Sequence, residues 1–141
     1  FETQKRAGLN DFTKIPNGGP GIENRLQLLY HYGVSQGRFS VNRWVELVAT
    51  NPAKLFGLYP KKGALLPGSD ADFVLVDPKA MYRLEDNAVI SKAGWTPFAG
   101  RDLKGKVIAT FVRGRRVAEN GRCIERAGWG RFVRPLAALE S

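Results

Sequence analysis

The sequence predicts an α/β fold in which a helical first part is joined to a β-rich second part. Apolar residues recur at helical spacing between residues 22 and 58, and beyond residue 58 the period of the apolar pattern changes to two. Glycine-containing turn signals near residues 114 and 121 then favour short antiparallel strands. We expect residues 59–63 to form the joint between the two parts.

The first twenty residues are polar and rich in turn-forming types, which predicts a loop. The loop ends in PNGGPG at residues 16–21, where Gly and Pro are too dense for regular structure. After these glycines, Ile22, Leu26 and Leu29 stand on one helical face. A helix is therefore predicted over residues 22–32.

A second helix is predicted to begin after Ser40, whose hydroxyl suits an N-cap. Its apolar face carries Val41, Trp44, Val45 and Val48. Asn51 and Pro52 are expected to interrupt it and to start a short new helix, with Asn as the cap and Pro at the first helical position. Gly57 is a natural terminator of that helix.

The β-rich part is predicted to hold strands at residues 73–76, 106–113, 116–119 and 122–124. Turn-forming residues at 67–70 precede the first strand, and residues 113–115 join the middle pair as a hairpin. Asn120 and Gly121 signal a tight turn into the last strand. Residues 128–141 are predicted to be a docking tail with apolar side chains at Trp129, Phe132, Val133, Leu136 and Leu139.

The composition fits a soluble globular protein. The 141 residues are 43% hydrophobic and 25% charged, and no apolar run approaches the roughly 18 residues of a membrane span. The start of the chain lacks the apolar core of a secretory signal, so we expect a cytoplasmic protein without membrane contact. The single cysteine, Cys123, cannot form an internal disulfide and is expected to be a buried or half-buried structural thiol.

The net charge of +9 is concentrated near the C-terminus. Between residues 101 and 134 there are ten Lys or Arg against three acidic residues, interleaved with Phe111, Trp129 and Phe132. Such a pattern is compatible with a nucleic-acid surface. We favour the alternative of solvated strand faces and a tail that faces a partner, and we expect no nucleic acid.

Three features are candidates for chemistry. The glycine-rich loop, residues 16–21, precedes a helix and aims backbone N–H groups at one point, which suits a carbonyl oxygen or an anion; a plain tight turn is the alternative. Asp70 is a turn former beside Ser69, and Asp72 is expected to fix a turn by hydrogen bonds; an acid–base or metal pair is not expected. His31 has no companions that would complete a metal site, so a surface or packing role is expected.

Two stretches of sequence carry a family resemblance. Residues 51–77, NPAKLFGLYPKKGALLPGSDADFVLVD, resemble a signature that closes enzymes of the amidohydrolase superfamily. Residues 11–26, DFTKIPNGGPGIENRL, together with GWGRFVRP at 128–135, resemble the hydantoinase and dihydropyrimidinase branch of the cyclic amidohydrolases. The resemblance runs over essentially the whole chain and corresponds to about the last third of such an enzyme.

The resemblance implies an architecture. Residues 1–58 would be the last segment of a (β/α)8 metal-dependent hydrolase barrel, whose active-site loops lie at the C-terminal ends of the strands. Residues 59–127 would be the C-terminal part of a small composite β-sandwich, and residues 128–141 the docking tail. Such enzymes are often tetramers, so a homotetramer is expected. The partner of this chain would then be the remainder of its own enzyme.

The resemblance also implies the site. Two zinc ions would be held by ligands upstream, because the chain has one histidine and begins at Phe1, where a motif ending TDHCPF would close. No catalytic or metal-binding residue is then expected in this chain. Asn17 would contact a cyclic ureide substrate through its backbone, with Gly18 letting the main chain approach the ring.

The sequence thus predicts the C-terminal part of a zinc-dependent cyclic amidohydrolase that opens dihydropyrimidines or hydantoins to N-carbamoyl amino acids, as in pyrimidine degradation. The chain alone is expected to be inactive. One alternative is a non-catalytic scaffold protein of the same branch, which the upstream metal ligands would distinguish. A basic nucleic-acid-binding module is the other alternative, and salt-sensitive binding to oligonucleotides would identify it.

Overall fold

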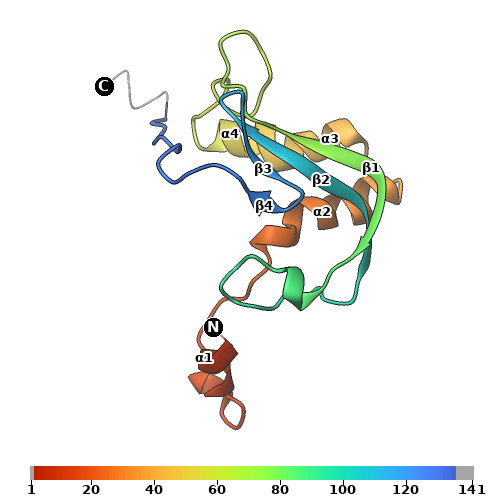
Figure 1. The fold of residues 1–141 in the computed structure, drawn as a ribbon, viewed down its shortest axis with the longest axis vertical. Coiled ribbons are helices and arrows are strands. Elements are labelled where there is room, and N and C mark those ends of the chain that lie inside the picture. Colours follow the sequence, from red (N-terminus) through yellow and green to blue (C-terminus); the bar gives the residue numbers. More distant parts are fainter. Residues whose placement is uncertain (1, 136–141) are drawn as a thin grey trace.

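The structure is a computed structural model that describes residues 2–135. Its helical elements are α1 (Glu2–Arg6), η1 (Phe12–Lys14), η2 (Ile22–Asn24), α2 (Arg25–Leu29), η3 (Tyr30–Ser35), α3 (Val41–Val45), η4 (Glu46–Thr50), α4 (Asn51–Leu55) and η5 (Asp86–Ala88). Its strands are β1 (Phe73–Arg83), β2 (Asp102–Val112), β3 (Arg115–Glu119) and β4 (Arg122–Cys123). Figure 1 shows α1 projecting from the body formed by the other elements.

The N-terminal twenty residues are more structured than the sequence predicts. They contain the short helix α1 and the 3-10 turn η1, which the expected loop omitted. Asp11 caps η1, because its Oδ1 accepts a hydrogen bond of 3.1 Å from the amide of Thr13. Residues 16–21 form no helix or strand, as predicted.

The first predicted helix is confirmed and continues beyond residue 32. η2, α2 and the π-helical η3 follow one another without a break from Ile22 to Ser35. Ser40 caps the second helix as predicted, and its Oγ accepts a hydrogen bond of 3.2 Å from the amide of Arg43.

The short helix α4 begins at Asn51 with Pro52 in its first turn, as predicted, but the break expected before it is wrong. The backbone stays helical from α3 through η4 into α4, and Asn51 is itself in the right-handed helical region rather than at a cap. Proline lacks an N–H group and crowds the carbonyl four residues earlier. The wider π turn, in which the amide of Asn51 donates to the carbonyl of Glu46, accommodates Pro52 without ending the helix. Gly57, at φ +66°, follows the end of α4.

The four strands form one antiparallel sheet in the order β1-β2-β3-β4. β1 starts at Phe73 as predicted but runs to Arg83, well past the predicted strand. Both predicted turns are present, with positive φ at Arg113 and Gly114 and again at Asn120 and Gly121. Two consecutive residues of positive φ match the twist of the strands that they join.

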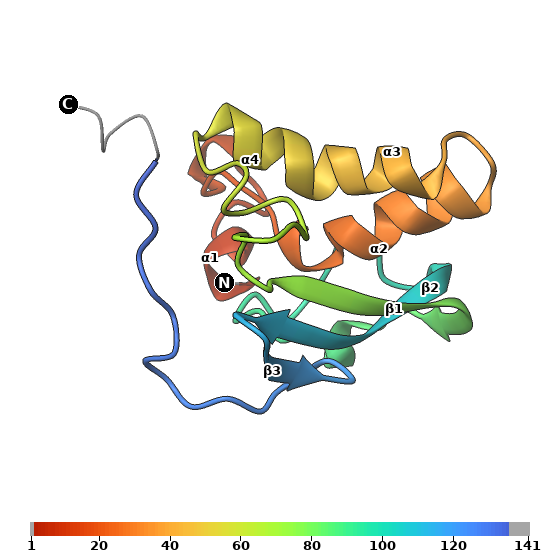
Figure 2. The same cartoon turned by 90° about the horizontal axis from the view of Figure 1, so that it is seen from above.

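The helices and the sheet form two layers, with α2, α3 and α4 above the strands in Figure 2. The core between them includes Tyr30, Trp44 and Leu103, and Leu103 has no exposed surface. The rings of Tyr30 and Trp44 meet edge to face with centroids 5.1 Å apart. His31 ties the layers together, since its Nδ1 accepts a hydrogen bond of 3.0 Å from the amide of Lys104.

The sheet ends at β4, which carries Cys123. Its thiol is exposed rather than buried or half-buried as expected, because β4 is a two-residue strand at the edge of the sheet. Among residues 2–135, no helix is long and apolar enough to cross a membrane.

Candidate functional site

The glycine-rich loop, residues 16–21, is exposed along most of its length and is held from α1. Lys5 Nζ donates to the carbonyl oxygens of Pro16 and, at 2.6 Å, of Gly18. Gly18 adopts φ +85°, a conformation that favours glycine. A Cβ atom added there would meet no atom within 4 Å, so the requirement is one of backbone conformation and not of space.

Asn17 lies between the two carbonyls that Lys5 binds. Its side chain is exposed, and no hydrogen bond joins any atom of Asn17 to another of residues 2–135. Its N–H and C=O groups are therefore available to an external partner. Asn17 and Gly18, the two predicted site residues, thus lie together on one exposed turn.

The loop continues into η2, which is attached to the connection between β1 and β2, residues 84–101. The Glu23 carboxylate accepts two backbone hydrogen bonds, from Ile90 at 2.9 Å and from Ser91 at 3.0 Å. Next to it, the buried Asn24 accepts a hydrogen bond of 2.7 Å from the Thr96 hydroxyl. In Figure 1 this connection, coloured green, lies beside the start of α2.

A cavity of about 640 Å³ opens behind the loop. Its walls come from the loop, from the helix that follows and from the β1–β2 connection, and they include Gly21, Ile22, Leu28, Leu29 and Phe98. Arg101 also lines it, and its guanidinium donates a hydrogen bond of 2.9 Å to the hydroxyl of Tyr32. Residues 19–21 of the loop therefore form one wall of this apolar cavity, whereas Asn17 and Gly18 do not line it.

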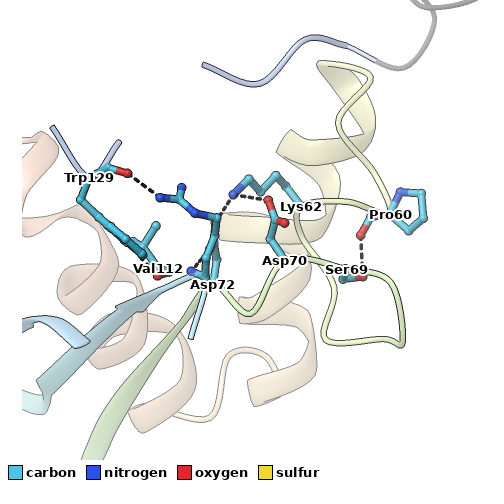
Figure 3. Close-up of polar contacts among 8 residues, drawn as sticks. Pro60, Lys62, Ser69, Asp70, Asp72, Val112 and Trp129 are labelled. Carbon is cyan, nitrogen blue, oxygen red and sulfur yellow. Dashed lines mark hydrogen bonds and ion pairs between the residues drawn. The ribbon is translucent and has the colours of Figure 1, made fainter. Parts of the chain in front are cut away.

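A second polar cluster, which we call the hairpin network, consists of Lys62, Asp70, Asp72 and Arg113. It connects residues 59–63 to the β2–β3 turn (Figure 3). Lys62 Nζ binds both Asp70, at 2.9 Å, and Asp72. Asp72 also accepts a hydrogen bond of 2.8 Å from the amide of Arg113 in the turn. The prediction that Asp72 fixes a turn by hydrogen bonds is confirmed.

These contacts shift two pKa values in the hairpin network. The hydrogen bond from Lys62 is the main reason that the pKa of Asp70 lies below its ordinary value. Partial burial acts to lower the pKa of Lys62, yet its hydrogen bonds to Asp72 and Asp70 outweigh this and raise the pKa. Both shifts favour the charged forms, as expected for a structural ion pair.

Trp129 fixes the start of the C-terminal tail on the same turn. The guanidinium carbons of Arg113 and Arg115 lie 4.5 Å and 4.9 Å from its ring centroid. Its Nε1 donates a hydrogen bond of 3.2 Å to the carbonyl of Val112, and Arg113 donates to the Trp129 carbonyl. Phe132 is exposed, whereas Leu136 and Leu139 of the predicted tail lie outside the described residues.

A larger apolar groove of about 930 Å³ lies between the helices and the ends of β1 and β2. Its lining includes Trp44, Val48, Phe56, Leu65, Leu66 and Phe73. Phe56, Leu65 and Leu66 remain exposed to solvent at 66%, 69% and 53% of their surface. Within residues 2–135, no group of three or more His, Cys, Asp or Glu side chains is arranged to hold a metal ion.

Sequence reasoning missed the groups that hold the glycine-rich loop. Glu23 belongs to the motif that carried the resemblance, but its partners are 67 and 68 positions away. Thr96 is 72 positions from Asn24, in a segment without periodicity, and Lys5 lies in the short helix that the loop prediction omitted. The one signal in the sequence for Glu23 was its position as an acidic residue at the start of the predicted helix.

Comparison with known proteins gives consistent matches. The sequence profile of the Amidohydrolase family matches residues 17–117. D-phenylhydantoinase from Escherichia coli O1:K1 is 44% identical over 124 residues, which are 88% of this chain and 27% of that protein.

Solved structures agree with these sequence matches. Dihydropyrimidinase from Brevibacillus agri superposes with a TM-score of 0.91 at 42% identity, over 96% of this chain and 29% of that chain. L-hydantoinase (dihydropyrimidinase) from Arthrobacter aurescens superposes with a TM-score of 0.88 at 38% identity, over 94% of this chain and 30% of that chain. The predicted α/β fold is confirmed, and its antiparallel sheet is shared with these proteins. The chain spans less than a third of their length.

Proposed function

This chain belongs to the amidohydrolase family, and from that premise we propose that it forms the C-terminal part of a zinc-dependent cyclic amidohydrolase of the dihydropyrimidinase or D-hydantoinase type. The reaction adds water across one ring amide bond of a dihydropyrimidine or hydantoin. The C–N bond breaks, the carbonyl carbon becomes a carboxylate, and the nitrogen stays in the N-carbamoyl amino acid that is the product.

The availability of the Asn17 peptide groups carries this proposal. A cyclic ureide presents alternating N–H and C=O groups along one edge, and a peptide N–H with a peptide C=O is the complementary pair. Lys5 binds the carbonyls on either side of Asn17 and leaves those of Asn17 itself without a partner among residues 2–135. Main-chain recognition of this kind sets the orientation of a flat ring as well as its affinity.

Zinc is assigned to residues outside the described part of the chain. Residues 2–135 offer no group of three or more suitable side chains, and His31 already accepts the Lys104 amide. Two zinc ions would supply an activated water and a polarised carbonyl when bound. The part played by the residues described here is to bind and orient the ring, with no step of proton transfer. We therefore expect this chain alone to be inactive.

The same proposal extends to architecture and assembly. Residues 1–58 would close a (β/α)8 barrel, residues 59–127 would complete a composite β-sandwich, and residues 128–141 would dock in a cytoplasmic homotetramer. The exposed apolar residues Phe56 and Leu65 along the large groove support an additional covering part, because such side chains seldom cluster on a monomer surface.

The nucleic-acid alternative has little support from the arrangement of the basic residues. Arg113 and Arg115 stack on Trp129, and Arg115 also pairs with Glu125 at 2.5 Å. Arg116 pairs with Glu119 at 2.5 Å. Guanidinium groups held by carboxylates and an indole are poorly placed to neutralise phosphates.

The test is to purify the full-length protein that carries this chain and to measure its zinc content and its hydrolysis of dihydrouracil and hydantoin. The 141-residue chain is assayed alongside. We expect about two zinc ions per subunit and turnover in the full-length protein only. Zinc-dependent ring opening by the 141-residue chain alone would contradict the proposal. A folded, metal-free and inactive full-length protein would favour the scaffold alternative.

A further inference from the structure

The β1–β2 connection, residues 84–101, is held in shape by hydrogen bonds among its own residues. Its two ends are joined by backbone hydrogen bonds, of 2.9 Å from Leu84 to Arg101 and of 2.8 Å from Gly100 to Leu84. Inside it, the Asp86 carboxylate accepts a hydrogen bond of 2.8 Å from the amide of Thr96. Leu84 and Thr96 are buried, at 7% and 5% exposure. The connection is therefore an ordered loop with buried residues at Leu84 and Thr96.

This element contacts the last residue of the glycine-rich loop and the residues that follow it at three places. Glu23 accepts the amides of Ile90 and Ser91, and Asn24 accepts the Thr96 hydroxyl. The ring of Phe98 lies 3.6 Å from the place where a Cβ atom of Gly21 would stand. These contacts involve Gly21, Glu23 and Asn24, which all lie within seven residues of Asn17.

Both oxygens of the Glu23 carboxylate are used in contacts with the β1–β2 connection. No Lys or Arg among residues 2–135 forms an ion pair with it, so both of its oxygens serve the two amides. Hydrogen bonds from backbone N–H groups to an ionised carboxylate are stronger than those between neutral groups. The Glu23 side chain thus makes two of the hydrogen bonds that hold the connection against the chain at the end of the loop.

We propose that the β1–β2 connection is a positioning clamp for the glycine-rich loop, with Glu23 and Thr96 as positioning residues for the Asn17 peptide groups. The inference rests on the proposed function, since it names residues that set substrate binding by acting through the loop. A displacement of about 1 Å in a substrate-positioning group lowers activity substantially, so loosening the clamp weakens binding without touching the reacting atoms.

The experiment compares Glu23→Gln with Glu46→Gln in the full-length protein. Gln keeps the size of Glu23 but retains one accepting oxygen, so one of the two amide bonds is lost. Glu46 is the matched control, because it is an exposed glutamate whose one ion pair within residues 2–135 is with Arg43, at 2.9 Å. We expect Glu23→Gln to raise KM for dihydrouracil or hydantoin by about threefold to tenfold, to change kcat by less than about twofold, and to speed amide exchange at Ile90 and Ser91. Glu46→Gln is expected to change none of these.

A second pair of variants guards against a folding defect. Thr96→Val removes the hydroxyl with little change of shape and leaves Asn24 without its donor, whereas Thr96→Ser keeps the hydroxyl. We expect Thr96→Val to reproduce the KM increase and Thr96→Ser to restore the wild-type value. Unchanged KM in both Glu23→Gln and Thr96→Val, with an active wild type, would overturn the clamp alone. A wild-type protein that hydrolyses no cyclic ureide would overturn the proposed function and the clamp with it.

Discussion

The glycine-rich loop and the hairpin network are both polar junctions between segments distant in sequence, and they differ in what they leave unsatisfied. In the hairpin network, Lys62 meets two carboxylates, Asp72 meets Lys62 and the Arg113 amide, and Arg113 meets Trp129. In the loop, the anchors are equally engaged, but the peptide groups of Asn17 have no partner among residues 2–135. A junction that satisfies all of its groups holds the fold, whereas one that keeps a peptide unit available can hold a ligand.

The largest effect is expected from a methyl group added to the glycine of each junction. Gly63 and Gly18 both have positive φ, but a Cβ atom at Gly63 would stand 2.5 Å from Ala53 Cβ and 2.9 Å from the carbonyl oxygen of Ala49. Gly63→Ala should lower the free energy of unfolding by about 3 kcal/mol, from crowding added to backbone strain. Gly18→Ala should cost about 1 kcal/mol, from strain alone.

Denaturant unfolding of the two purified full-length variants provides the measurement. Equal destabilisation by the two substitutions would show that the joint can relax around a methyl group, and the contrast between a packed and an open junction would be lost. A catalytic assay of Gly18→Ala is a second test, because strain in the loop should raise KM while leaving the rest of the protein folded.

A smaller effect is expected from removing single carboxylates of the hairpin network. Asp72→Ala leaves both Lys62 and the amide of Arg113 without this partner, so we expect a loss of about 2 kcal/mol. Asp70→Ala removes an ion pair with Lys62 only, and about 0.5 kcal/mol is expected. Thermal unfolding of the two variants measures the difference. If Asp70→Ala proved the more harmful, Asp72 would not be the centre of the network.

The pH dependence of stability sharpens the same assignment. Because Lys62 lowers the pKa of Asp70 in the folded state, Asp70 contributes stability that is present above the ordinary value of 3.8 and is lost as pH falls through the folded pKa. Lys62 has a raised pKa, so its contribution is complete below 10.5 and is lost as pH rises through the folded value. Asp70→Asn should therefore lower stability at neutral pH by less than about 1 kcal/mol, leave stability below the folded pKa of Asp70 unchanged, and so flatten the acid limb of the stability curve. An unchanged acid limb in titration by thermal unfolding would contradict this.

The sequence predicted the local elements well and the long-range attachments poorly, for physical reasons that particular residues illustrate. The cap at Ser40 and the turn at Arg113 and Gly114 depend on neighbours within a few positions, so composition and order reveal them. The continuous helix through Pro52 depends on a π turn that no local propensity encodes. The grip of Glu23 on Ile90 depends on how two segments meet in space.

The candidate site shows the same division between local and long-range features. Asn17 and Gly18 were predicted as site residues because the resemblance to hydantoinases falls on contiguous residues, and Gly18 has the positive φ that its type suggests. Lys5 was missed because one lysine in a polar stretch has no pattern to distinguish it from a solvated charge. Asp72 was placed correctly as a turn residue, while its bond to Lys62 became visible only with the joint folded against the hairpin.

The smallest effect on stability and on KM is expected from a substitution of Asn17. This substitution tests directly whether the loop binds a ligand through its backbone. Its side chain is exposed and makes no hydrogen bond with the other described residues, so Asn17→Ala should change the free energy of unfolding by less than about 0.5 kcal/mol. If the backbone makes the substrate contact, KM should also change by less than about threefold. Steady-state kinetics with dihydrouracil and hydantoin decide the point. A large rise in KM would assign recognition to the carboxamide, because alanine keeps the same N–H and C=O groups while removing every polar atom of the side chain.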